Sequence, residues 1–175
     1  MTFSTYEKSI NKSSIVWLTP PSILDLFPLA DTDPCAAPEP RPWATAKTMM
    51  VEADDGLSKE WSGTIWLNPP YGKNMDKWMK KMALHGQGFA ITYARTDTRW
   101  FHDWVAPYAS AIFFFKGRLK FHRPCGSVGA ASTAPHMLIA YSSQSADLLA
   151  AIDVPGILYR PDSSTHKTNG VLYAR

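Results

Sequence analysis

Residues 64–72 read TIWLNPPYG, an apolar run that ends in two prolines and a tyrosine. Thr64 to Leu67 has the β-branched and aromatic residues of a strand, and the prolines that follow end it. Each proline fixes its own φ, and the residue before a proline is held in an extended conformation. The sequence therefore predicts a strand with a rigid end that holds Asn68 and Tyr71 beside it.

The segments on either side of this motif alternate between strands and helices. Met75–His85 is predicted to be a helix, because its methionines and Trp78 recur at helical spacing with lysines between them. Further strands are predicted at a short segment ending at Asp33, and at Met49–Val51, Gly88–Tyr93, Ala111–Phe115, His136–Tyr141, and Arg118–Phe121, which Gly117 would join to Ala111–Phe115. Further helices are predicted at Ser22–Phe27, Thr98–Val105 and Ala146–Ala151. This alternation predicts an α/β fold with a mainly parallel sheet flanked by helices.

The length and composition indicate a single globular domain. The chain has 175 residues, 45 % of them hydrophobic, which is enough to bury one core. It has no internal repeat and no linker that would separate two domains, so residues 15–175 are expected to form one domain without a separate recognition domain. Residues 1–14 and roughly 163–169 are polar and are expected to be mobile tails.

The composition also argues against several classes of protein. No apolar run approaches the roughly 20 residues of a membrane-spanning helix, and the N-terminus lacks the apolar stretch of a signal peptide, so a cytoplasmic protein is expected. Cys35 and Cys125 cannot build a disulfide framework, and no Cys/His cluster has zinc spacing, so no metal is expected. A net charge of +3 permits nucleic-acid binding, and 7 Trp and 8 Phe favour a dense core, stacking surfaces or both.

Two motifs follow predicted strands, where ligands bind in parallel α/β sheets. One is residues 33–37, which read DPCAA, and the other is residues 68–71, which read NPPY. In the second motif the Asn68 side chain and the Pro69 carbonyl provide two acceptors beside the aromatic face of Tyr71. This arrangement suits a planar ring that carries an NH₂ group, because both amino hydrogens are accepted while the ring stacks. The alternative interpretation is a strand terminator followed by a surface turn.

Several further short motifs accompany NPPY. They are RPW at 41–43, TAK at 45–47, DDGL at 54–57, Trp61, ARTDT at 94–98, WF at 100–101 and GRLKF at 117–121. With DPCA at 33–36 and WLNPPYG at 66–72, this set resembles the phage and prophage DNA N6-adenine methyltransferases, from about Trp17 to Tyr141. The four residues NPPY alone are also found in protein-glutamine and ribosomal-RNA methyltransferases, whereas the combined set is specific.

The resemblance implies a single Rossmann-like domain that binds S-adenosylmethionine across the strand ends. It also implies methyl transfer to the N6 amino group of an adenine that is flipped out of double-stranded DNA. The residues similar to the family's catalytic motif are Asn68, Pro69, Pro70 and Tyr71. The expected cofactor-binding residues are Trp17, Thr19, Pro20, Asp33, Pro34, Cys35, Ala36, Asn68 and one of Asp54 and Asp55. Ala36 and Ala37 stand where the family's cofactor loop normally contains glycines.

Basic residues near two other predicted strands are candidates for contacts with DNA. Arg95 and Arg99 follow Gly88–Tyr93, and Lys116, Arg118, Lys120 and Arg123 form a basic run around Phe121. This pattern suits phosphate contacts combined with stacking, and the alternatives are a surface salt-bridge cluster and a basic edge hairpin. The expected DNA-binding residues are Tyr71, Lys73, Arg95, Arg99, Arg118, Lys120 and Phe121.

Three alternatives remain to be weighed against this interpretation. Cys35 follows a proline, as the nucleophile of cytosine-C5 methyltransferases does, but no neighbour would activate its thiol, so Cys35 is interpreted as a packing residue. The chain could be a protein or RNA amino-methyltransferase that uses the same motif. It could also be an inactive methyltransferase fold that binds DNA, although the intact Asn68 and Tyr71 argue against this.

Overall fold

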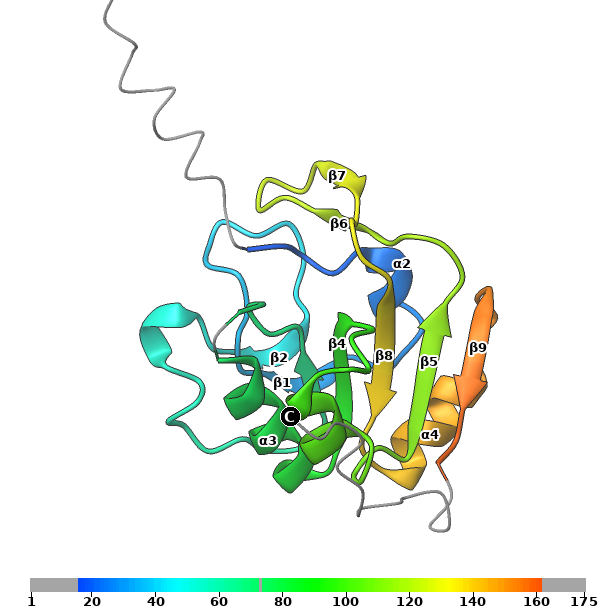
Figure 1. Ribbon diagram of the computed structural model, residues 1–175. Helices are drawn as coiled ribbons and strands as arrows, with labels where there is room; N and C mark the ends of the chain where they lie inside the picture. Colours follow the sequence, from blue (N-terminus) through cyan, green and yellow to red (C-terminus); the bar gives the residue numbers. More distant parts are fainter. Residues whose placement is uncertain (1–15, 73, 162–175) are drawn as a thin grey trace, which may run out of the picture.

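The computed structural model describes residues 16–72 and 74–161 (Figure 1). Both predicted tails and Lys73 lie outside the described residues. The strands are β1 (Ala30–Asp33), β2 (Ala46–Met49), β3 (Ile65–Leu67), β4 (Gly88–Tyr93), β5 (Ala111–Phe115), β6 (Lys120–His122), β7 (Val128–Ala131), β8 (His136–Ala140) and β9 (Gly156–Tyr159). The helical segments are α2 (Pro21–Leu24), η1 (Glu52–Asp54), α3 (Met75–His85), η2 (Phe101–Val105) and α4 (Ser143–Ala150).

Seven of these strands form one sheet in the order β2-β1-β3-β4-β8-β5-β9. The pairs from β2 to β4 are parallel, whereas β8 is antiparallel to both β4 and β5, and β9 is antiparallel to β5. Strand β5 therefore runs in the same direction as β1 to β4, and only β8 and β9 oppose them. The predicted α/β sheet with a parallel core is confirmed, with antiparallel strands toward one edge.

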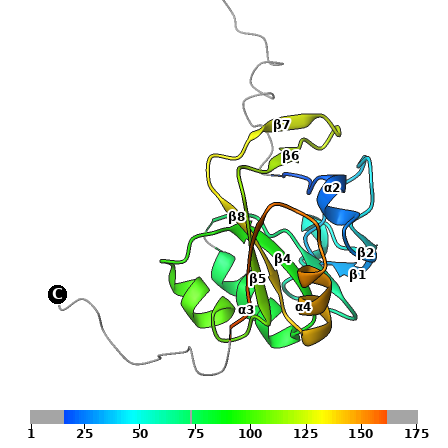
Figure 2. The same cartoon turned by 90° about the vertical axis from the view of Figure 1, so that its right-hand side faces the viewer.

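Helical segments cover both faces of the sheet (Figure 2). Side chains of successive strand residues point to opposite faces, so the two cores draw on alternate positions of each strand. Ile65 and Leu67 pack with α3 and η2 in one core, and Trp66 between them packs with α2 and α4 in the other. Burial on both faces explains why the central strands are apolar throughout rather than alternating with polar residues.

Two predictions about strands are wrong. The strand expected at Met49–Val51 lies earlier, at β2, which is an edge strand with few apolar residues to mark it. The hairpin expected around Gly117 does not form, because both edges of β5 are already paired, with β8 and β9. Strand β6 instead pairs with β7 in a separate two-stranded sheet. Strands β7 and β9 were not predicted.

One of the four helix predictions has the observed bounds, and the other three differ in extent or in helix type. Helix α3 has the predicted bounds, while α2 is shorter than Ser22–Phe27. The segment predicted as a helix at Thr98–Val105 becomes a π-helical turn at η2, in which Ala106 N donates to Phe101 O at 2.8 Å. Helix α4 begins before Ala146, because the Ser142 side chain caps it by accepting a bond from Ser145 N.

Strand β1 lies at the point where the strand order reverses. The chain leaves β1 for β2 on one side of it, and β3 then lies on the other side. Ligands of open α/β sheets bind in the crevice at such a point, outside the carboxyl ends of the strands. β1 ends at Asp33 and β3 at Leu67, so the two motifs singled out in the sequence meet there. The β6–β7 sheet lies beyond the same end of the main sheet (Figures 1 and 2).

The helices of residues 16–72 and 74–161 are all too short or too polar to span a bilayer.

Packing of α3 on the sheet is expected to contribute strongly to stability. Met79 is 0 % exposed in the core beneath α3, whereas Leu84 on the same helix is 64 % exposed. Met79→Ala should lower the free energy of unfolding by about 2–5 kcal/mol, because it removes buried contacts and leaves a cavity. Leu84→Ala should change it by less than about 0.5 kcal/mol. Urea unfolding of both variants tests this, and similar losses would contradict the assigned packing of α3.

Candidate active site

Asn68 follows β3, and its side chain is anchored by the segment before α2. Asn68 Nδ2 donates to the Trp17 carbonyl oxygen at 2.8 Å. Since the amide nitrogen is engaged, Oδ1 is the end of the side chain that can accept a bond from a ligand. No donor among the described residues reaches Oδ1. The anchor is itself fixed, because the backbones of Leu18 and His122 exchange hydrogen bonds of 2.9 and 3.0 Å.

The loop after β1 is joined to this motif through Cys35. The thiol of Cys35 donates to the Asn68 carbonyl oxygen at 3.2 Å, and Cys35 N donates to Asp33 Oδ1 at 3.0 Å. Asp33 also accepts a bond from the Thr45 hydroxyl, and burial raises the pKa of its carboxyl to about 6. Burial, reinforced by Asp33, raises the pKa of the Cys35 thiol as well. A raised pKa is the opposite of what a nucleophile needs, and Cys35 packs against the buried cluster that contains Leu67, so both observations favour the expected packing role.

Residues 54–56 lie against the same loop. A Cβ added to Gly56 would lie 1.9 Å from the Pro34 carbonyl oxygen, so only glycine allows this approach. Asp54 accepts a bond from Val51 N at 2.8 Å, so its carboxylate is engaged within its own turn. Asp55 is exposed and has a positive φ of 49°.

Trp17, Thr19 and Pro20 lie beside the Asn68 anchor. Thr19 is 1 % exposed, and its hydroxyl has no partner among the described residues. The Trp17 ring is 41 % exposed and rests on Gly129 of β7, where an added Cβ would lie 2.6 Å from the indole. Pro20 is the N-cap residue of α2.

Tyr71 stacks on Tyr93, the last residue of β4. The ring centroids are 4.2 Å apart and the ring planes differ by 29°. The Tyr71 phenol oxygen is buried without a partner in the described part of the chain, and burial raises its pKa. One face of the Tyr71 ring is therefore covered by Tyr93, which the sequence did not reveal.

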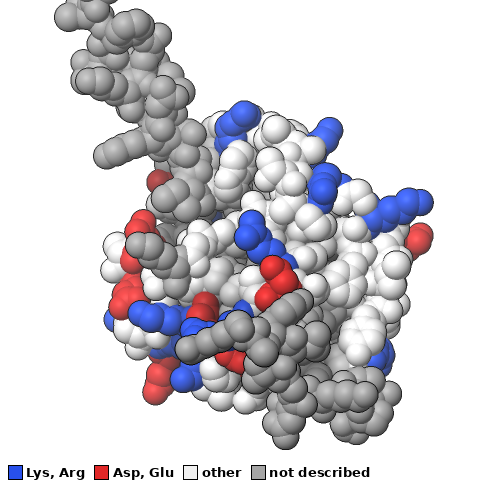
Figure 3. All heavy atoms as spheres, viewed as in Figure 1, with Lys and Arg blue, Asp and Glu red and all other residues white. Residues whose placement is uncertain are grey.

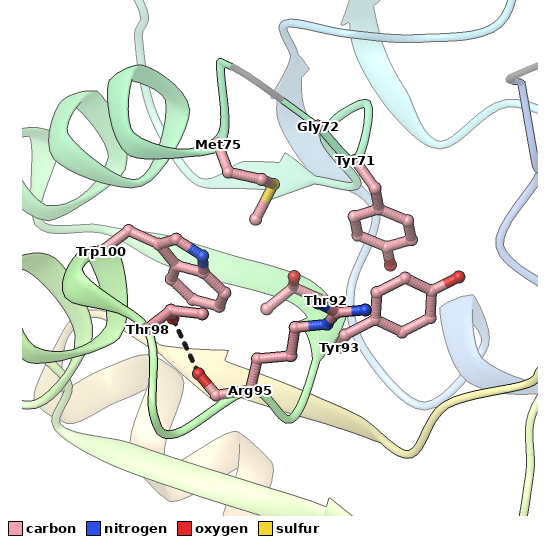
Figure 4. A pocket seen from close by; sticks show the side chains of 8 residues that line it. All are labelled: Tyr71, Gly72, Met75, Thr92, Tyr93, Arg95, Thr98 and Trp100. Carbon is pink, nitrogen blue, oxygen red and sulfur yellow. Dashed lines mark hydrogen bonds between the residues drawn. The ribbon is translucent and has the colours of Figure 1, made fainter.

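A pocket of about 330 Å³ borders the two tyrosines (Figure 4). Tyr71 and Tyr93 lie on one side of it and Met75 and Trp100 on the other, with Thr92 between them. Thr92 is 0 % exposed, and its hydroxyl has no partner within residues 16–72 and 74–161. The pocket is completed by Gly72, Arg95 and Thr98.

His136 lies behind Tyr93 at the start of β8. Its ring centroid is 4.8 Å from that of Tyr93 and 4.8 Å from that of Phe121. His136 is 2 % exposed, and burial lowers its pKa to about 4. Sequence reasoning assigned no role to His136, and its position between Pro135 and an apolar run was the only available signal. Phe121 is buried as well, so stacking of a base on Phe121 would require movement and stays a prediction.

The expected DNA-binding cations lie in two places. Arg95 lines the pocket, with its guanidinium 5.8 Å from the Tyr93 ring centroid, and Arg99 lies 3.9 Å from Asp103. Arg118 and Lys120 are exposed around β6. The sequence has no acidic residue between Asp103 and Asp147. Figure 3 shows Lys and Arg side chains on the upper part of this face, where β6 and β7 lie in Figure 1.

The described residues contain no group of three or more His, Cys, Asp or Glu side chains that could hold a metal ion.

His136 is expected to control part of the pH dependence of stability. Its pKa is about 4 in the folded protein against an ordinary 6.5. Between these values the unfolded chain binds the proton first, so the free energy of unfolding falls as the pH falls. His136→Phe removes this contribution, so wild type should lose stability relative to the variant as the pH is lowered through this range. Urea unfolding at several pH values measures the difference.

Asp33 acts in the opposite direction and serves as an internal control. Burial raises the pKa of its carboxyl from 3.8 to about 6, so its contribution is lost as the pH rises through that range. This contribution is the same in wild type and in His136→Phe, and it cancels in their difference. Parallel pH profiles for the two proteins would contradict the assignment to His136.

Comparison with known proteins identifies the family to which the chain belongs. The family model for DNA N-6-adenine-methyltransferase (Dam) matches residues 8–146, which is more than half of the chain. No curated protein and no solved structure matches the chain. The matched region contains both strand-end motifs, the Tyr71–Tyr93 stack and the β6–β7 sheet. The chain therefore belongs to the DNA N-6-adenine-methyltransferase (Dam) family of S-adenosylmethionine-dependent enzymes.

Proposed function

We propose that this chain transfers a methyl group from S-adenosylmethionine to N6 of an adenine flipped out of double-stranded DNA. The observation that carries this proposal is the hydrogen bond from Asn68 Nδ2 to the Trp17 carbonyl, because it leaves Oδ1 as an acceptor beside Tyr71. An acceptor next to an aromatic face fits an aromatic amine. The same pair of groups would be poorly matched to an alkyl ammonium group, which has no ring to stack.

The residues at the switch point fit S-adenosylmethionine. The ends of β1 and β3 are the usual location for such a ligand in an open α/β sheet, and Thr19, close in sequence to Trp17, has a buried hydroxyl without a partner among the described residues. Bound there, S-adenosylmethionine would supply an electrophilic methyl group. The proposed contacts are Trp17, Thr19, Pro20, Asp33, Pro34, Cys35, Ala36 and Asn68, with Asp55 favoured over Asp54 because the Asp54 carboxylate is engaged by Val51 N.

Asn68 and Pro69 prepare the adenine nitrogen for alkylation. Asn68 Oδ1 and the Pro69 carbonyl accept the two N6 hydrogens, which opposes delocalisation of the nitrogen lone pair into the ring. The lone pair is then available for bond formation with the methyl carbon. Positive charge that develops on N6 is stabilised by the same two oxygens, so catalysis depends on orientation and electrostatics. No strong base is needed, because N6 becomes more acidic as it is alkylated, and the released proton would pass by way of the Asn68 and Pro69 oxygens to water.

Tyr71 and the basic residues bind the DNA. Because Tyr93 covers one face of the Tyr71 ring, the extruded base is placed on the other face. Base–aromatic stacking of this kind contributes roughly 1–3 kcal/mol. Arg118 and Lys120 near β6 contact phosphates, and so does Arg95 at the mouth of the pocket. Arg99 is a weaker candidate, because Asp103 lies 3.9 Å from its guanidinium. Lys73 stays a prediction from the sequence.

Asn68→Ala is expected to lower turnover by at least about a hundredfold, the effect of losing one transition-state hydrogen bond. Affinity for S-adenosylmethionine should change much less, as measured by calorimetry. The assay uses labelled S-adenosylmethionine and unmethylated DNA, and the product is digested to nucleosides and identified by mass. N6-methyladenine is the expected product. N4-methylcytosine alone, or methylation of RNA or protein in preference to DNA, would overturn the proposal, as would near-normal turnover of Asn68→Ala.

DNA affinity is expected to depend on salt through the residues around β6. Replacing Arg118 and Lys120 by Gln should weaken binding and lower the salt slope by about one unit for each lost phosphate contact. Lys77→Gln is the matched control, because Lys77 is an exposed cation on α3. Fluorescence anisotropy with labelled duplex at several salt concentrations measures the slopes. An unchanged slope in the Arg118/Lys120 variant would assign these cations to folding or solubility instead.

A further inference from the structure

The Tyr71 ring is held by ring contacts rather than by a hydrogen bond. Its phenol oxygen is buried and has no partner among the described residues. On the pocket side, Gly72 has no atom within 4 Å of the position of a Cβ, and the pocket of about 330 Å³ adjoins the ring. The shortest ring contact of Tyr71 is therefore the stack with Tyr93 at 4.2 Å, and the His136 ring lies 6.2 Å from it.

Tyr93 is in turn fixed by the main sheet. Tyr93 and His136 are directly opposite partners in the β4–β8 ladder, and their rings are 4.8 Å apart. His136 also contacts Phe121 of β6 at 4.8 Å. A continuous series of rings thus runs from β6 through Phe121, His136 and Tyr93 to Tyr71. Cross-strand aromatic pairs are among the stronger side-chain contacts of a sheet, so this series is a rigid support.

Stability of the fold does not account for a histidine in this series. Neither ring nitrogen of His136 makes a well-formed hydrogen bond in the described part of the chain, and the Ala134 backbone opposes the effect of burial on the His136 pKa without cancelling it. A buried polar group without a hydrogen bond destabilises the folded state relative to an apolar side chain of the same shape. The property of His136 that the structure does use is its flat ring, which packs against Tyr93.

We propose that Tyr93 and His136 are positioning residues for methyl transfer, which hold the Tyr71 ring so that its free face receives the extruded adenine. This inference rests on the proposed function, since it assumes that Tyr71 stacks on the target base. Neither residue touches the base. Tyr93 backs the Tyr71 ring, and His136 keeps Tyr93 from turning away from it.

Ring removal and ring retention at Tyr93 are compared first. Tyr93→Ala should lower the single-turnover methylation rate by about two- to tenfold, the range measured for aromatic pairs. Tyr93→Phe keeps the ring and should recover the rate to within about twofold. His136→Ala should likewise lower the single-turnover rate, and His136→Phe, which keeps a ring, should recover it. Tyr108→Ala removes a ring that is 44 % exposed beyond η2 and serves as the control that leaves the rate unchanged. Melting temperatures and S-adenosylmethionine affinity are measured for every variant.

A double-mutant cycle with Tyr71 separates positioning from general damage. If Tyr93 acts through Tyr71, then Tyr93→Ala should have no further effect on the rate in a Tyr71→Ala background. The loss should also shrink on DNA whose target adenine lies opposite an abasic site, because extrusion of an unpaired base needs less stabilisation. Additive losses, or an equal deficit on both DNAs, would overturn the proposal. If wild type forms no N6-methyladenine, the proposed function itself fails. If wild type is active and Tyr93→Ala matches Tyr93→Phe, only the positioning role fails.

Discussion

The hydrogen bond from Asn68 to the Trp17 carbonyl is the constraint on which the rest of the site depends. An asparagine amide has a donating and an accepting end, and rotation by half a turn exchanges them. The Trp17 carbonyl can only accept, so it fixes the nitrogen toward itself and gives Oδ1 to the crevice. With Oδ1 in this position, Asn68 can accept a hydrogen bond from an amine. With Nδ2 in the same position, it would instead donate one to a carbonyl. Trp17 comes from a segment far from Asn68 in sequence, so the chemistry of the motif depends on tertiary structure.

Asn68 and Tyr71, the two side chains proposed to hold the target base, are supported by different sets of contacts. Asn68 is oriented by the segment before α2, which the Leu18–His122 bridge ties to β6. Tyr71 is supported through β4 and β8, and His136 in that support also contacts β6. Both sets of contacts reach the small β6–β7 sheet. Lys120 lies in β6, and Arg118 lies just before it. The surface proposed to contact DNA is therefore connected through direct contacts to both residues proposed to hold the base.

Sequence patterns predicted the helices and strands whose bounds depend on neighbouring residues. They did not predict the edge strands or the hydrogen bonds that join distant parts of the chain. The bounds of α3, β4 and β5 follow from helical spacing and apolar runs, and the structure confirms them. β2 was misplaced because an edge strand needs few apolar residues, and β7 was missed because Val-Gly-Ala-Ala carries no strand pattern. The strand-end motifs were recognisable because prolines rigidify the chain locally. The Asn68–Trp17 and Cys35–Asn68 bonds join residues 51 and 33 positions apart, and no spacing in the sequence encodes them.

Gly129 limits how this protein can diversify. The exposed positions of β6 and β7 can exchange side chains without disturbing the main sheet, so the surface proposed to contact DNA can vary there. Gly129 is different, because the Trp17 indole occupies the space that any side chain would need. A larger residue would push on Trp17, whose carbonyl orients Asn68. The backbone carbonyl of Phe121 would also lie 2.7 Å from the added Cβ, so a side chain at position 129 would disturb both β6 and the segment that anchors Asn68.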